Sequence, residues 1–322
     1  MELREVATNE LDYLFDLADK YGTVFSSKRW IDLYNAENVL KLGYYENDGK
    51  LIGGVFLYKR KTLIGNLLLG FPFSPHVDIF FEKENKNNSK RNSFIKQLTT
   101  LLVNYVNNQN IILFSVAFNP NYKDLQPFLW NNYKVSLLYT YKIDLGLSLS
   151  EIEKLYSPER RNDIKKAKRD NVIIKKTDDY EVLLKLIKNT FNRQSKSVDI
   201  YFIEKLLTNY NHNNSFIFTA FDKDGVELSS CFFIYDRNTV YYLLSGYNND
   251  LKHHGAGPLC IDEAIKYSKL LGLKFFDFEG SMQPQIEKYF RGFGGDLVYY
   301  PYVNKSFLLF EVLLKFKKRR LF

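Results

Sequence analysis

Two carboxylates near the end of the chain, Asp277 and Glu279, are the residues best placed to handle a proton. They close an apolar run, Leu273 to Phe278, that predicts a buried strand. Strand alternation would direct both to one face at the C-terminal end, where open α/β sheets bind ligands. Burial and mutual repulsion raise the pKa of such a pair toward that of a base acting near pH 7. A structural pair with an arginine is the alternative.

A glycine-containing segment, Lys252 to Pro258, separates a predicted strand at Tyr241 to Ser245 from a helix that runs to Leu271. A helix N-terminus offers backbone N–H groups and the positive end of its dipole to a pyrophosphate, and glycines let phosphates approach closely. A helix start without a ligand is the alternative. The residues expected to bind a donor are Lys252, Gly255, Ala256, Gly257 and Pro258.

A basic helix is predicted to begin at Ser157 and Pro158, an N-cap followed by proline at the first helical position. Arg161, Lys165 and Lys168 fall on one face of this helix. We expect Arg161 and Lys165 to bind an anionic part of the substrate, with a solvated charged helix as the alternative.

A metal site is not expected. The four histidines and two cysteines are scattered, and His253 and His254 are adjacent, so that their side chains point to different sides. Zinc sites need ligands that converge on one point.

Several strings resemble the FemAB-like branch of the GNAT acyltransferase superfamily. Residues 161–168, RNDIKKAK, with Val172 after them, are similar to the family's R-x-x-I-[RK]-K-A-x-K-x-G-V pattern, with Asn171 in place of glycine. Residues 276–280, FDFEG, and 290–294, FRGFG, resemble its F-D-F-x-G and F-[KR]-x-F-G pair. The segment from Lys252 is similar to the R/Q-x-x-G-x-G/A loop that binds the pyrophosphate of an acyl-CoA.

The resemblance implies two tandem GNAT-like domains: a degenerate one over 1–147 that shapes the acceptor cleft, and one over 148–322 that holds the donor loop and the catalytic residues. It places Tyr289 near the tyrosine that protonates the leaving thiolate. It also implies substrate-binding residues, to which we add Gly246 at a strand end and Arg291 as a possible partner of a carboxylate or phosphate. The full set is Trp30, Arg161, Lys165, Arg193, Gln194, Gly246 and Arg291.

The elements that must position these residues form a mixed α/β fold. Turn residues Asn47–Gly49 and Lys223–Gly225 each join two predicted strands, and the order of elements around the two hairpins is similar. Duplication of one domain plan is therefore predicted.

Composition indicates the cellular compartment and the kind of binding partner that we expect. The charged N-terminus has no apolar stretch behind it, and Cys231 and Cys260 lie in apolar surroundings, so we expect two buried free thiols in a cytoplasmic protein. The net charge of +8 suits an anionic partner such as CoA, tRNA or a membrane surface. The basic residues 317–320 offer a peripheral contact with anionic lipid, and a solvated tail is the alternative. No DNA partner is expected.

The resulting hypothesis is an N-acyltransferase that uses acyl-CoA as cosubstrate, with no tightly bound cofactor, and acylates an amine of a cell-envelope precursor such as an amino sugar, a glycan or a peptidoglycan peptide. An aminoacyl-tRNA-dependent peptidoglycan-bridge ligase is the alternative within the family. A non-catalytic binding protein on the same fold is the alternative from another class.

Overall fold

The computed structural model describes residues 1–82, 87–193, 199–210, 214–280, 282–307, 310–312 and 314–315. The chain divides into two compact units: unit 1 comprises Met1–Leu138 and Tyr299–Phe322, and unit 2 comprises Tyr139–Val298. The sequence analysis placed one boundary at 147/148, whereas here unit 1 ends at Leu138 and also includes the C-terminal segment from Tyr299. No helix among the described residues has the length and apolar character needed to cross a bilayer.

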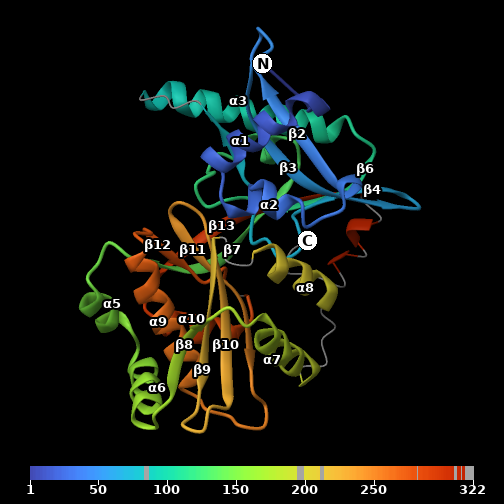
Figure 1. Cartoon of the computed structure of the whole chain (residues 1–322). Coiled ribbons are helices and arrows are strands. Elements are labelled where there is room, and N and C mark those ends of the chain that lie inside the picture. Colours follow the sequence, from blue (N-terminus) through green and yellow to red (C-terminus); the bar gives the residue numbers. More distant parts are fainter. Residues whose placement is uncertain are drawn as a thin grey trace. The chain divides into compact units, whose positions relative to one another are not determined.

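Unit 1 is a sheet with helices around it (Figure 1). Its strand order is β1 (Glu2–Glu5), β2 (Val39–Tyr45), β3 (Leu51–Thr62), β4 (Gly65–Leu69), β6 (Ile111–Ala117) and the C-terminal β13 (Asp296–Ser306), and β5 (Ile79–Phe81) pairs with β3. The α-helices are α1 (Leu11–Tyr21), α2 (Lys28–Ile31), α3 (Asn88–Asn107) and α4 (Gln126–Trp130). Short 3₁₀ helices lie at η1 (Thr8–Glu10), η2 (Val24–Ser26) and η3 (Ala36–Asn38).

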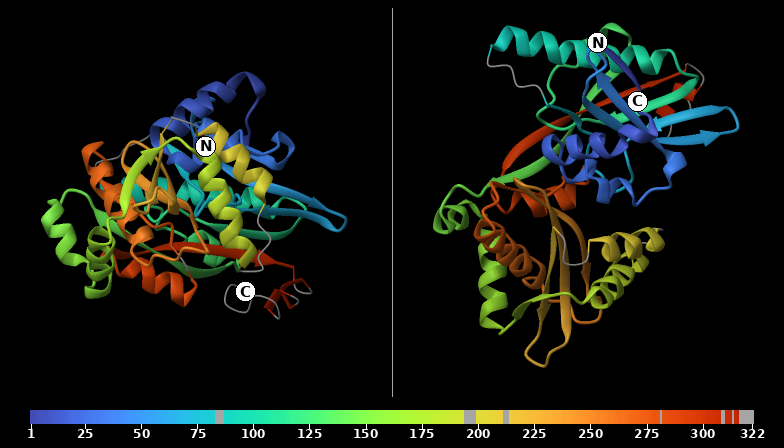
Figure 2. Two further views of the ribbon diagram at one scale, coloured as in Figure 1. Left: turned by 60° about the horizontal axis from the view of Figure 1, so that its bottom comes forward. Right: turned by 45° about the horizontal axis from the view of Figure 1, so that its top comes forward.

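Unit 2 has the same kind of sheet, with α6 and α9 on one face and α7 on the other (Figures 1 and 2). Its strand order is β8 (Ile173–Thr177), β9 (Ser215–Phe221), β10 (Glu227–Tyr235), β11 (Thr239–Tyr247), β12 (Phe275–Asp277) and β7 (Lys134–Asp144). The helices are α5 (Leu149–Leu155), α6 (Pro158–Arg169), α7 (Tyr180–Arg193), α8 (Ile200–Asn209), α9 (Ala256–Leu270) and α10 (Pro284–Arg291).

The two strand orders correspond position by position. In each unit the fourth and fifth strands are parallel (β4 with β6, β11 with β12), and the fifth strand pairs antiparallel with the sixth. The sixth strand is exchanged: β13, from the end of the chain, pairs with β6 in unit 1, and β7 pairs with β12 in unit 2. The mixed α/β fold and the repeated plan are therefore confirmed, and the exchange explains why the units do not follow the simple halves of the sequence.

Both predicted hairpins are confirmed and have the same turn. In the β2–β3 hairpin, Glu46 N–H donates to Lys50 O at 2.9 Å and Gly49 has a φ of 86°. In the β9–β10 hairpin, Asp222 N–H donates to Val226 O at 2.9 Å and Gly225 has a φ of 82°. Glycine carries no penalty in this left-handed conformation, which is why the two turns are readable from sequence.

The core of unit 2 is aromatic. The Phe233 ring stacks on Tyr242, and Phe278 stacks on Phe290, with centroid distances of 5.3 and 5.0 Å. The Phe278–Phe290 contact attaches α10 to the segment directly after β12, and α10 is also held by the Tyr141 hydroxyl, which donates to Glu287 at 2.6 Å. Cys231 and Cys260 are buried free thiols, as predicted.

A buried carboxylate organises the loops of unit 1. Asp78 is buried and accepts hydrogen bonds from Thr23 N–H and Oγ1, Ser26 Oγ and Asn119 Nδ2, at 2.6 to 3.0 Å. His76 Nδ1 lies 3.3 Å from its other side. Burial alone would raise the pKa of Asp78, but His76 and the Thr23 donors outweigh it and hold the pKa well below its usual range.

We expect Asp78→Asn to lower the stability of the protein at pH 7 by about 3 kcal/mol, because an amide cannot accept all of these donors. A depressed pKa stabilises the folded state above the ordinary Asp range, and this contribution is lost as the pH falls. The difference in melting temperature between wild type and variant should therefore shrink below about pH 4. Asp48→Asn in the exposed β2–β3 turn is the control and should melt like wild type at every pH; a constant Asp78→Asn deficit would contradict the assignment.

Candidate active site

The parallel strands β11 and β12 are paired only over the first three residues of β11. The pairing runs through Thr239–Phe275, Val240–Phe276 and Tyr241–Asp277, and stops there. On its other side β11 stays paired with β10 as far as Tyr247. Beyond Tyr241, one backbone edge of β11 thus has no strand partner among the described residues, at the carboxyl end of the parallel pair. In unit 1, by contrast, β4 is paired with β6 up to its last residue, Leu69.

The loop that follows β11 offers backbone donors. His253 closes the start of α9: its Nδ1 accepts from Gly255 N–H at 3.2 Å and its carbonyl accepts from Ala256 N–H at 3.1 Å. Its Nε2 lies 3.2 Å from Asp170 at the end of α6, and this contact lowers the pKa of Asp170. In this loop and the first turn of α9, four backbone N–H groups form no hydrogen bond within the described part of the chain. They belong to Lys252, His253, His254 and Gly257.

The two glycines of the loop have different reasons to be glycine. A Cβ at Gly255 would lie 2.2 Å from the carbonyl oxygen of Asp163, so Gly255 lets α9 pack directly against the backbone of α6. A Cβ at Gly257 would lie 3.0 Å from the hydroxyl of Tyr247 and 3.2 Å from that of Tyr289. Only Gly257 therefore borders polar side-chain groups, whereas Gly255 serves helix packing.

Tyr247 and Tyr289 bring two hydroxyls to the first turn of α9. The Tyr289 hydroxyl is buried and forms no hydrogen bond with any described residue. The Tyr247 hydroxyl lies close to it. Burial raises the pKa of Tyr247 to about 12, and burial together with the Tyr247 and Cys231 groups raises the pKa of Tyr289 well above its usual value. Both hydroxyls therefore keep their protons across the physiological range and can act as donors.

A buried arginine that the sequence analysis did not select lies beside Tyr289. The guanidinium of Arg160 sits 4.7 Å from the centre of the Tyr289 ring, its Nη2 lies 3.0 Å from Asp163, and its Nε has no partner among the described residues. Gly292 leaves room for it, because a Cβ there would lie 2.8 Å from Arg160 Cγ. The signal was available: Arg160 precedes the buried Ile164 and Ala167 at helical spacing, and a charge on a buried face is unusual.

The two carboxylates take different positions. Asp277 is buried and accepts from Thr140 Oγ1 at 2.6 Å and from Glu279 N–H at 2.8 Å, which fixes the turn after β12. Strand β12 ends at Asp277, and Glu279 adopts a φ of 57°, so the expected strand alternation does not reach it. Burial, followed by the charge of Asp277, raises the pKa of Glu279 well above its usual value. The pair is close, as expected, but it is a turn and not a strand that brings it together.

Several other candidates are occupied by structural contacts. Arg161 donates to the carbonyls of Lys154 and Tyr156 at the end of α5, at 3.2 and 2.7 Å. Arg291 pairs with Glu287 at 2.8 Å, not with either site carboxylate. Gly246 packs β11 onto α7, since a Cβ would lie 2.4 Å from the Ile187 nitrogen.

The remaining candidates are dispersed. Lys165 and Lys252 are exposed. Trp30 is fully buried in unit 1, where its Nε1 donates to Ser74 Oγ at 2.7 Å. Arg193 is the last residue of α7; its side chain and Gln194 lie outside the described residues.

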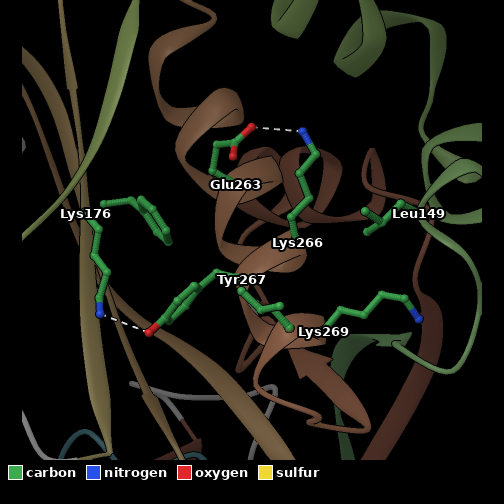
Figure 3. Close-up of a pocket in the computed structure, with 8 residues that line it drawn as sticks. Leu149, Lys176, Glu263, Lys266, Tyr267 and Lys269 are labelled. Atoms are coloured by element: carbon green, nitrogen blue, oxygen red, sulfur yellow. Dashed lines mark hydrogen bonds and ion pairs between the residues drawn. The ribbon is translucent and has the colours of Figure 1, made fainter.

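A groove of about 560 Å³ runs along the C-terminal half of α9, away from its first turn (Figure 3). Its lysines already have partners: Lys176 donates to the Tyr267 hydroxyl at 2.9 Å, Lys266 pairs with Asp262 and Glu263, and Lys269 donates to two main-chain carbonyls. The Lys176 and Lys269 contacts brace α9 against β8 and the segment after β7, and the Lys266 pairs lie within α9, so we assign no chemistry to the groove. Across the part of the chain that the structure describes, no group of three His, Cys, Asp or Glu side chains could hold a metal ion.

Comparisons agree with this geometry. Residues 159–291, from α6 to the end of α10, match the family model described as Acetyltransferase (GNAT) domain. The fold is similar to the crystal structure of FemX (TM-score 0.68, 12% identity, 98% of this chain and 99% of that one covered). It is also similar to L-PGS from Bacillus licheniformis (0.59, 10%, 99% and 98%) and to a tandem GNAT protein from the clavulanic acid biosynthesis pathway (0.52, 9%, 95% and 98%). No curated protein sequence gives a significant match.

A GNAT domain match that spans the separated strands, the α9 loop and both tyrosines agrees with the sequence resemblance. The chain is therefore an acyltransferase that carries a GNAT acetyltransferase domain at residues 159–291, on the fold of FemAB-like proteins.

Proposed function

We propose that the protein transfers an acyl group from an acyl-CoA to an amine of a cell-envelope precursor. The observation that carries the proposal is the backbone edge of β11 beyond Tyr241, which no strand among the described residues pairs with and which leads into the donor loop at Lys252 to Pro258; at its far end the Tyr247 N–H donates to Thr190 Oγ1 at 2.9 Å. An extended amide-containing ligand can pair with such an edge as an added strand would. The phosphates of the acyl-CoA would then meet the backbone N–H groups at the start of α9.

The loop has the chemistry for a pyrophosphate. Lys252 and His254 are exposed or partly exposed, and the unused N–H groups of residues 252–254 and of Gly257 are donors that need no deformation to bind an anion. Gly257 is buried in the first turn of α9 and borders two hydroxyls. Gly255 contributes through packing rather than contact.

The reaction needs one proton acceptor and one proton donor. The nitrogen lone pair of the acceptor amine attacks the thioester carbonyl carbon, so that a C–N bond forms and the C–S bond breaks. We assign the amine proton to Glu279, a buried carboxyl whose pKa is raised by burial and by the charge of Asp277. We assign the proton for the leaving sulfur to the buried hydroxyl of Tyr289. Asp277, committed to Thr140 and the Glu279 backbone, then positions Glu279.

The FemAB-like strings and the similarity to FemX support an acceptor from cell-envelope chemistry: an amino sugar, a glycan or a peptidoglycan peptide. One observation favours an aminoacyl-tRNA as donor instead. Lys165, Lys166, Lys168 and Arg169 are exposed on α6 and form a basic face that suits a phosphate backbone. Release of free thiol from acetyl-CoA or longer acyl-CoAs, compared with deacylation of charged tRNA, in the presence of amino-sugar and peptide amines, distinguishes the two donors.

Gly257→Val should weaken acyl-CoA binding by roughly tenfold or more, because the added methyl groups displace Tyr247 and Tyr289 and cover the loop backbone. Isothermal titration with CoA measures the effect. Gly70→Val is the matched control: nothing lies within 4 Å of a Cβ there and its φ is not in the left-handed region, so it should bind like wild type. Unchanged affinity in folded Gly257→Val would remove the loop from the donor site.

Glu279→Gln should lower kcat by about 10²–10⁴-fold with little change in CoA affinity, because it removes the proton acceptor but keeps the size of the side chain. Its stability should also change with pH in a defined direction. A raised folded-state pKa stabilises the protein below the ordinary Glu range, and this contribution is lost as the pH rises through the folded pKa. Wild type should therefore lose melting temperature relative to the variant as the pH rises above the ordinary Glu range, by roughly a few degrees.

Glu287→Gln is the control variant, for which the pH dependence of stability should have the opposite sign. The hydrogen bond from Tyr141 and the Arg291 pair lower the pKa of Glu287. Any stability it contributes is present at neutral pH and is lost on acidification. If Glu279→Gln instead melts much earlier than wild type and keeps its turnover, Glu279 is a structural residue.

Tyr289→Phe should lower kcat by about 10²-fold or more and leave KM for the amine nearly unchanged, since only the hydroxyl is lost. Steady-state kinetics with a thiol-release readout measures both constants. Tyr299→Phe, a half-exposed tyrosine in unit 1, is the control. Full activity of Tyr289→Phe, together with loss in Tyr247→Phe, would transfer the proton-donor role to Tyr247.

A further inference from the structure

The β3–β4 hairpin of unit 1 extends beyond β2, the strand that flanks β3. Strand β2 pairs with β3 only as far as Tyr58, whereas β3 continues to Thr62 and pairs there with β4 alone. Figures 1 and 2 show this hairpin, in light blue, projecting away from the rest of unit 1 in every view. On its other side β4 is paired with β6 from Asn66, close to the turn, to Leu69, which stiffens the hairpin.

Two aliphatic residues occupy the tip of this hairpin. Leu63 and Ile64 form the turn between Thr62 and Gly65 and are 107% and 66% exposed. Turns of this kind normally carry Gly, Asn, Asp, Pro or Ser, which suit the backbone and the solvent. Neither residue has a positive φ, so the turn geometry does not call for an unusual residue type. Turn formation therefore does not explain a leucine and an isoleucine at the most exposed point of the strand pair.

Cations follow directly behind the tip. Lys59, Arg60 and Lys61 lie on β3, with Arg60 and Lys61 exposed, and none of the three forms an ion pair within the described ranges. The hairpin, residues 58–69, contains no acidic residue. Three uncompensated positive charges thus stand next to two exposed apolar side chains at the end of a stiff projection.

We propose that the β3–β4 hairpin binds the surface of an anionic phospholipid bilayer, with Leu63 and Ile64 in the interfacial region and residues 59–61 at the phosphate groups. The chemistry of the hairpin matches the layers of such a surface: apolar side chains enter the boundary of the acyl chains, and cations a few residues behind them meet the anionic headgroups. The proposal goes beyond the acyl-transfer function and uses none of the residues assigned to it.

The charge pattern favours a bilayer over a protein partner. A protein surface would fix a two-residue apolar tip with complementary hydrogen bonds and opposite charges at defined positions, whereas a fluid anionic surface needs only the order of apolar tip and basic stem. The exposed edge of β3 beyond Tyr58 also carries lysine, a residue that discourages edge-to-edge pairing of sheets. Self-association through this hairpin is the competing outcome that the experiment must detect.

The test is co-sedimentation of the full chain with vesicles made of equal parts phosphatidylcholine and phosphatidylglycerol, beside vesicles of phosphatidylcholine alone. Wild type should bind the anionic vesicles, and binding should weaken as salt is added. L63N/I64N and, separately, K59Q/R60Q/K61Q should each lower the apparent affinity by roughly tenfold or more. Asparagine suits a turn, so L63N/I64N should keep the melting temperature and the thiol-release activity of wild type.

Two control variants show whether vesicle binding depends on this hairpin in particular. Leu270→Asn removes an aliphatic residue that is 81% exposed in unit 2 and should not change binding. A variant with glutamine at residues 317–320 tests the basic tail, which lies outside the described residues. The proposal is overturned if wild type does not sediment with anionic vesicles, if only the tail variant loses binding, or if L63N/I64N leaves vesicle binding unchanged and instead changes the oligomer size measured by light scattering.

Discussion

The parallel contact between β11 and β12 governs the candidate site of unit 2. Parallel strands normally remain paired along their shared length, but here the pairing ends at Tyr241 and Asp277. One strand then runs on to Tyr247 and leads into a loop and α9, and the other turns sharply at Glu279 and Gly280, both with positive φ. The backbone edge, the helix N-terminus and the buried carboxylate follow from that one separation. The equivalent pair in unit 1 stays joined up to Leu69, the last residue of β4, so the two units differ at this position.

Close backbone packing holds this arrangement in place. Gly255 admits α6 onto α9, Gly246 admits α7 onto β11, and Gly292 makes room for the stem of Arg160. Interiors packed at this density leave no space for a methyl group without displacement of a neighbour. Gly257 differs because its neighbours are tyrosine side chains, so the lack of a side chain there makes room for two hydroxyls rather than for a neighbouring backbone.

Much of the positive charge in unit 2 serves structure. Arg161 satisfies the carbonyls that end α5, and Lys269 satisfies those of Leu145 and Leu147. Orphan carbonyl and N–H groups at helix ends must find partners, and long cationic side chains reach them. A basic composition is thus a weak guide to a ligand, and the informative cation is the buried one, Arg160, beside Tyr289.

The sequence by itself determined the features that depend only on neighbouring residues. The turns at Gly49 and Gly225, the start of α6 at Ser157 and Pro158, the helix after Gly255 and the buried thiols all depend on residues within a few positions of each other, and each is found in the structure. The strings around Asp277 and Phe290 also sufficed to indicate the acyltransferase fold. Only the tertiary structure decided the pairing of β13 with β6, because that contact joins positions almost two hundred residues apart and no local pattern encodes it. The same holds for the meeting of Tyr289 with Gly257, and for Glu279, which a turn rather than strand alternation places beside Asp277. Side-chain positions that depend on two elements packing together follow from the whole core, and sequence spacing measures only one element at a time.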